Sequence, residues 1–194
     1  MRFFCKFAFS FLIILSTTGT AFALTQGENF LVTQIKGFKQ GFIDKKNGML
    51  MVEYVPQGET VQNWTEMHTV QIIYGIKIPT DQFLARIGQG FKKGCDEVEA
   101  KYPTKGLVNG YQSEQIFFSC TKEKQTGKGS LTLFRVIQGN DSFYVIQRAW
   151  RGAPFKSDQM PISNDKFKSW MAYMESVSVC DTRGKLHPCP SVTK

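Results

Sequence analysis

Three strand-like segments follow one another between residues 110 and 150, and the turns that join them are short. Their sequences are GYQSEQIFFSC (110–120), SLTLFRVIQG (130–139) and NDSFYVIQRAW (140–150). A polar stretch, KEKQTGKG, precedes the second segment, and Gly139-Asn140-Asp141 precedes the third; both have turn compositions. Parallel neighbours need a crossover of a dozen or more residues, which these turns cannot supply. We therefore predict an antiparallel three-stranded meander, around which the rest of the fold has to be built.

The N-terminal half holds three more strand candidates. Asn47-Gly48 separates apolar-rich runs at 37–43 and 49–55, and this dipeptide is the strongest short-range signal for a hairpin. After a loop at 57–60, a long strand is expected over 63–75. Alternation along that strand places on one face the side chains of Trp64, Glu66, His68, Val70 and Ile72.

Two segments have the apolar period of a helix. Pro79-Thr80-Asp81 begins the first, with Thr80 as the expected cap. Its apolar stripe consists of Phe83, Leu84, Ile87 and Phe91, and it extends through Cys95, Val98 and Tyr102 if Gly94 does not stop it. The second helix is expected over 163–177, capped by Ser163 or Asn164, with a stripe of Phe167, Trp170, Met171, Met174 and Val177.

The order of these elements, βββαβββα, predicts the fold class. Residues 24–36 show no strong period and lead into the fold. Two helices with one apolar face each need a surface to cover, and an antiparallel sheet supplies it. We expect an α+β domain with a sheet of about six strands covered by two main helices.

The first 23 residues have the three parts of a secretory signal peptide. Arg2 and Lys6 give a positive start, residues 7–15 are almost wholly apolar, and Ala21-Phe22-Ala23 is a small-x-small cleavage site. The apolar run is well short of the ~20 residues that cross a bilayer, so we expect cleavage after Ala23 and no membrane-spanning segment. Residues 24–194 are then a single exported domain, periplasmic or secreted.

Four cysteines remain after that cleavage, and an even number in an oxidising compartment indicates two disulfides. Four cysteines allow three connectivities. Proximity favours Cys180 with Cys189, which closes the C-terminal tail, and Cys95 then pairs with Cys120. A zinc site using His187 would match no common ligand spacing, and a redox centre would prefer a Cys-x-x-Cys motif. We therefore expect disulfides, with no metal and no cofactor.

The charge is positive but dispersed. The formal net charge of +8 falls to +6 when Arg2 and Lys6 leave with the signal, and the remaining lysines form separate pairs along the chain. Dispersed charge of one sign mainly keeps a protein soluble, although weak contact with an anionic surface is compatible with it. No helix-turn-helix, zinc-finger or aromatic RNA-binding motif accompanies the charge, so we do not expect nucleic acid as a partner.

Candidates for catalysis are few. His68 could act as a general base with Glu66, but no Gly-x-Ser-x-Gly elbow supplies a nucleophile. Isolated strand glutamates such as Glu53 and Glu114 are not at a set distance from Glu66, as paired carboxylates would be. No catalytic residue is therefore assigned. The expected interaction surface is Trp150 with Arg151 at a strand end, together with Trp64 and His68; the alternative is that the tryptophans belong to the core.

Two segments of the chain resemble a family of small exported proteins of Gram-negative bacteria. The first, EYVPQGETVQNWTEMHTVQ (53–71), contains the family's GET..NWTEM.TVQ pattern, and the second is GNDSFYVIQRAWR (139–151). This resemblance implies no particular catalytic residue. The element order is also similar to the PsbP/Mog1-type fold, an antiparallel sheet between helices, whose members are mostly accessory or binding proteins.

The expected function is therefore that of an exported, non-enzymatic binding or accessory protein. Its partner is expected to be a protein or another envelope component, and a virulence-associated factor that acts on a host surface is one form of this function. The alternative is an envelope hydrolase that uses His68 with a carboxylate.

Overall fold

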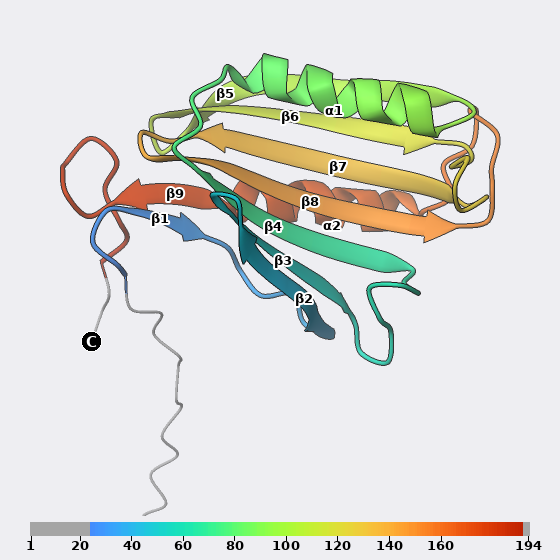
Figure 1. Cartoon of the computed structure of the whole chain (residues 1–194), viewed down its shortest axis with the longest axis horizontal. Coiled ribbons are helices and arrows are strands. Elements are labelled where there is room, and N and C mark those ends of the chain that lie inside the picture. The colour runs from blue at the N-terminus through green and yellow to red at the C-terminus, as the bar shows by residue number, and fades with distance from the viewer. Residues whose placement is uncertain (1–23, 192–194) are drawn as a thin grey trace, which may run out of the picture.

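Residues 24–191 are described by the computed structural model, which contains two sheets and two helices (Figure 1). Seven antiparallel strands form the main sheet in the order β2-β3-β4-β8-β7-β6-β5, and β1 pairs with β9 in a separate two-stranded sheet. The elements are β1 Glu28–Leu31, β2 Phe38–Lys46, β3 Met49–Pro56, β4 Glu66–Tyr74, α1 Thr80–Gly94, β5 Val98–Val108, β6 Tyr111–Cys120, β7 Gly129–Gln138, β8 Ser142–Gly152, α2 Asn164–Ser176 and β9 Ser178–Asp181. The predicted signal peptide, residues 1–23, lies outside the described residues.

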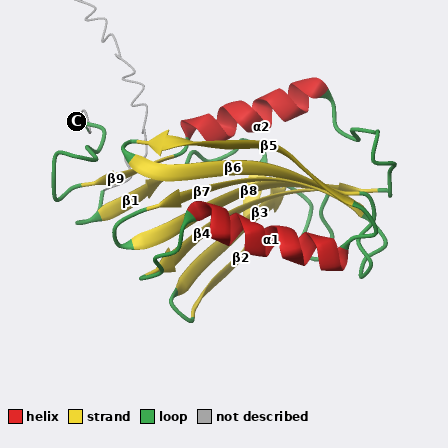
Figure 2. Cartoon of the chain, turned by 90° about the horizontal axis from the view of Figure 1, so that it is seen from above, coloured by secondary structure: helices red, strands yellow, loops and turns green. Residues whose placement is uncertain are grey.

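The predicted meander is confirmed and forms the centre of the sheet. β6, β7 and β8 are sequential antiparallel neighbours, and the two helices lie on opposite faces of the sheet (Figure 2). On the α1 side, Leu84 packs in one cluster with Phe118 and Phe134. On the α2 side, Trp170 packs in another cluster with Phe117. Successive residues of a strand point to opposite faces, so one chain segment serves both cores.

The predicted hairpin at Asn47-Gly48 is also confirmed. Both residues have positive φ angles, 53° and 70°, as a type I′ turn requires. Lys46 pairs with Met49 across the turn, which fixes the register of β2 against β3.

The first helix differs from its prediction at both ends. Pro79 is its N-cap, and the Thr80 hydroxyl donates instead to the carboxylate of Glu114 (3.0 Å). Gly94 is the last helical residue, so the apolar stripe does not continue as a helix through Val98 and Tyr102. Those two residues belong to β5, the seventh strand of the sheet. The strand has a bulge and contains Pro103, as edge strands often do.

The N-terminal lead-in and the C-terminal tail meet in the small sheet. β1 pairs with β9 from Glu28 opposite Asp181 to Leu31 opposite Ser178. Each strand has four residues, which is too short for a clear sequence period, and the two are far apart in the chain. This pairing was absent from the sequence prediction.

Both predicted disulfides are confirmed. Cys180 and Cys189 have Cα atoms 4.8 Å apart and close the tail beside β9. Cys95 and Cys120 have Cα atoms 5.6 Å apart and join the residue after α1 to the end of β6. In the tail loop, the His187 ring is half-buried and stacks on Tyr111, with a centroid distance of 3.7 Å.

Within the described part of the chain, neither helix has the length and apolar character needed to cross a bilayer.

Candidate functional site

A cavity of about 420 Å³ lies on the α2 face of the sheet, over β3 and β4. We call it the groove. Its floor comes from side chains that alternate along β3 and β4 toward that face, and the segment between β1 and β2 forms its other wall. It is lined by Phe30, Val32, Thr33, Gln34, Ile35, Gln40, Val52, Tyr54, His68, Val70 and Ile72. Every one of these side chains is apolar or uncharged polar, apart from a single histidine.

His68 lies in the floor of the groove and is only 2% exposed. Its Nε2 is 3.0 Å from the Tyr173 hydroxyl, which donates its own proton to the Thr33 carbonyl (2.9 Å). The imidazole therefore donates through Nε2–H to the tyrosine oxygen. The ring stacks on Tyr54 on its other side. Burial, and secondarily the positive charge of Arg148, lower the pKa of His68 to about 3, so the imidazole is neutral at pH 7.

Behind His68 lies a group of charged side chains, Glu66, Arg148 and Lys166, which we call the ion cluster. Arg148 is 7% exposed and pairs directly across from His68 in the sheet. Its guanidinium is 3.3 Å from a Glu66 oxygen, and the Lys166 ammonium is 2.6 Å from the other oxygen. Rings of Phe38, Trp170 and Tyr173 surround the guanidinium at 5.4–5.5 Å. Among the described residues, Arg148 Nε has no hydrogen-bond partner.

Glu66 and His68 share a strand face as predicted, but they are not hydrogen-bonded to each other. The Glu66 carboxylate bonds to Arg148 and Lys166, and the imidazole bonds to Tyr173. The other candidate carboxylates, Glu53 and Glu114, lie elsewhere. Glu114 faces the start of α1, where it accepts a hydrogen bond from the Thr80 hydroxyl. Glu53 belongs to β3, lies opposite Thr69 of β4 and points to the face away from the groove. The three glutamates are therefore not brought together.

The predicted interaction residues divide between the two faces of the sheet. Trp64 precedes β4, and its ring lies 4.3 Å from the guanidinium carbon of Arg151. It packs beside Met67 on the face opposite His68, so the prediction that both share a face is wrong. Trp150 packs against the α2-side core and Phe155. Of these residues, His68 is the one that lines the groove.

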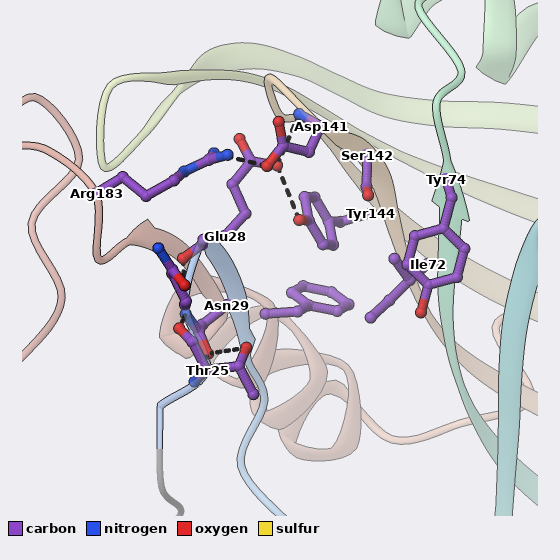
Figure 3. A pocket seen from close by; sticks show the side chains of 12 residues that line it. Thr25, Glu28, Asn29, Ile72, Tyr74, Asp141, Ser142, Tyr144 and Arg183 are labelled. Atoms are coloured by element: carbon purple, nitrogen blue, oxygen red, sulfur yellow. Dashed lines mark hydrogen bonds and ion pairs between the residues drawn. The ribbon is translucent and has the colours of Figure 1, made fainter.

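A second cavity of about 620 Å³ adjoins the groove, and we call it the end cavity (Figure 3). It is lined by residues 25–30 together with Ile72, Tyr74, Asp141, Ser142, Tyr144 and Arg183. Sequence reasoning missed it because residues 24–36 have no period that identifies them as a wall.

The charged groups of the end cavity already have hydrogen-bond or ion-pair partners. Glu28 accepts hydrogen bonds from the Tyr144 hydroxyl (2.9 Å) and from the Asp141 amide (3.1 Å). Arg183 forms ion pairs of 2.6 Å with both Asp141 and Asp181. Its hydrogen bonds hold the pKa of Asp181 at about 2. Within residues 24–191, no group of three or more His, Cys, Asp or Glu side chains is placed to hold a metal ion.

Comparisons with known proteins add a remote structural likeness. No protein-family model matches the chain, and no curated protein matches its sequence. The chain is similar to a structure of a mutant of the protein Mog1, with a TM-score of 0.42, 12% identity, and coverage of 74% of this chain and 78% of that chain. It is also similar to the Ran-binding protein Mog1p of Saccharomyces cerevisiae, with a TM-score of 0.43, 11% identity, and coverage of 77% and 85%. The likeness concerns the path of the chain alone, and membership in the family of small exported Gram-negative proteins stays a prediction.

Proposed function

We propose that this chain is an exported, non-enzymatic binding protein that holds part of an envelope component in the groove. The observation that carries the proposal is the groove itself, a cavity of about 420 Å³ with mainly apolar walls and a few uncharged polar groups. This volume and lining are typical of sites that bind small molecules or inserted side chains.

The state of the polar groups supports binding over catalysis. A general base needs a pKa near the working pH and a free lone pair within reach of its target. The pKa of His68 is about 3, far below such a pH, because the ring is buried. The carboxylate nearest in sequence, Glu66, is bonded to two cations.

Export rests on the signal-peptide pattern of residues 1–23, and the two disulfides accord with an oxidising compartment. A partner in the envelope follows from that location. It is a protein or a lipid component of the envelope, and a host-surface partner is the form that a role in virulence would take.

A variant with a filled groove tests the proposal. Val52 lines the groove, so Val52→Trp places a large ring in the cavity. Leu107→Trp is the matched control, because Leu107 is 63% exposed on β5 at the far edge of the sheet. Each protein is immobilised and exposed to a solubilised envelope fraction, after circular dichroism has shown that both variants fold.

We expect one envelope component to be retained by the native protein and by Leu107→Trp, and to be lost with Val52→Trp. Equal retention by all three proteins would contradict the assignment of the site. Absence of any specifically retained component would contradict a binding function in the envelope.

A further inference from the structure

The groove and the end cavity lie next to each other along β4, and we call the two together the trough. Phe30 and Ile72 line both cavities. The side chains of His68, Val70, Ile72 and Tyr74 point to the same side of the strand in succession, and six residues of strand span about 20 Å. Figure 3 shows Ile72 and Tyr74 forming one side of the end cavity, with Glu28 across from them. The trough therefore fits an elongated ligand whose apolar part lies along Val70 and Ile72.

The two ends of the trough differ in charge. At the His68 end, the ion cluster has two cations for one carboxylate. Arg148 is almost completely buried there, with one ion pair and an Nε that has no partner in the described part of the chain. A buried cation with incomplete pairing is stabilised by a further anion nearby.

Arg148 does not line the groove, but it lies directly opposite His68 on the neighbouring strand, so the positive charge of the cluster lies beside the His68 end of the groove. The charge of Arg148 contributes, after burial, to the low pKa of His68. The potential that opposes a proton on the imidazole attracts a negative ligand group to the same place. At the far end of the trough, Arg183 is already paired with Asp141 and Asp181, and Glu28 adds a further carboxylate. An anionic head is therefore favoured at the His68 end and disfavoured at the other.

We propose that the trough binds a long-chain carboxylate, with its head beside His68 and Tyr54 and its apolar chain along Val70 and Ile72 toward the end cavity. The Tyr54 hydroxyl and the Gln40 amide line the head end and can donate hydrogen bonds to the carboxylate. This inference names the ligand class of the proposed binding function and rests on it.

Three ligands with the same ten-carbon chain test the ligand class: decanoate, decanol and decylamine. Each displaces the neutral fluorescent probe N-phenyl-1-naphthylamine from the purified protein at pH 7.5 and low ionic strength, where electrostatic differences are largest. We expect decanoate to bind about tenfold more tightly than decylamine, with decanol between them. The ion cluster attracts the carboxylate of decanoate and repels the ammonium of decylamine, whereas decanol has no charge.

A pair of lysine variants tests the origin of that preference. Lys166 belongs to the ion cluster and is 38% exposed, so Lys166→Met removes a cation without leaving a buried charge unpaired. Lys168 lies on the same helix and is exposed. We expect Lys166→Met to reduce the preference for decanoate over decylamine about two- to threefold, as loss of one partly screened charge does, and Lys168→Met to leave it unchanged.

Each alternative result overturns a defined part of the inference. If the three ligands bind equally and Val52→Trp abolishes their binding, the binding site stands and the carboxylate assignment fails. If decylamine binds more tightly than decanoate, the carboxylate assignment also fails. If the probe and all three ligands fail to bind, the inference of a long-chain ligand fails, and retention of an envelope component that Val52→Trp abolishes decides separately whether the proposed function stands. Equal effects of the two lysine variants refute the role of the ion cluster.

Discussion

Replacement of Glu66 should destabilise the protein more than replacement of Arg148, although both changes break the same ion pair. Glu66→Gln leaves the guanidinium of Arg148 without a carboxylate in a setting that is 7% exposed. Breaking a buried pair in this way costs about 3–5 kcal/mol. Because the Glu66 side chain is itself 19% exposed, water can reach part of the site, and we expect a loss at the lower end, about 3 kcal/mol.

Arg148→Met removes the buried charge itself. Glu66 keeps its 2.6 Å ion pair with Lys166, and the methionine side chain can fill the space between the surrounding rings. The lost cation–π contacts are worth about 2 kcal/mol each in a buried site, but the cost of burying the guanidinium, which is several kcal/mol, disappears at the same time. We expect a net loss of about 1 kcal/mol. In the double variant with Glu66→Gln and Arg148→Met, the loss of unfolding free energy should be smaller than the sum of the two single losses, because no unpaired guanidinium remains.

Urea unfolding followed by tryptophan fluorescence measures these free energies, because the buried Trp170 ring packs beside the Arg148 guanidinium. Lys168→Met is the control and should change the free energy of unfolding by no more than about 0.5 kcal/mol. If Arg148→Met costs as much as Glu66→Gln, or if the two losses add, the electrostatic account of the ion cluster is wrong.

The disulfides and the buried histidine give two further predictions. Replacing Cys95 and Cys120 by serine should cost about 3.5 kcal/mol, and replacing Cys180 and Cys189 about 2.6 kcal/mol, because the first pair closes the longer loop (25 against 9 residues of separation); urea unfolding that shows the opposite order would contradict this reasoning. The folded-state pKa of His68, about 3, lies below the ordinary value of 6.5, so its contribution to stability is complete above pH 6.5 and is lost as the pH falls toward 3. Between pH 7 and pH 5 the native protein should lose about 2 kcal/mol through this group, and His68→Gln should lose correspondingly less in urea titrations at the two pH values; an identical loss in both proteins would show that the imidazole is not buried in its neutral form.

The parts of the fold that the sequence predicted are those with strong local signals. The Asn47-Gly48 turn requires a conformation that few other residue pairs adopt easily, and short turns after Cys120 and at Gly139 restrict the meander to antiparallel pairing. The cap of α2 was predicted at Ser163 or Asn164 because a capping hydroxyl or amide acts within its own helix turn, and the structure has Ser163, which accepts from the Lys166 amide (3.2 Å).

The parts that were missed depend on partners far away in the chain. β5 has Pro103 and several polar residues, and its strand character comes from pairing with β6. The four-residue β1 is a strand because β9 lies beside it. For the same reason His68 was identified as a candidate, but its partner Tyr173, which lies 105 residues further along the chain, was not.

The amino-acid sequence by itself determined the α+β class, the alternation within the main strands and the apolar faces of both helices, and it favoured one of three pairings of the four cysteines. These properties follow from backbone geometry and spacing, which act over a few residues. Only the tertiary structure decided that Arg148 is buried beside Glu66, that His68 is neutral, and that the N-terminal segment closes a trough over β4. Burial and electrostatic potential depend on every group within several ångströms, and those groups come from separate segments of the chain.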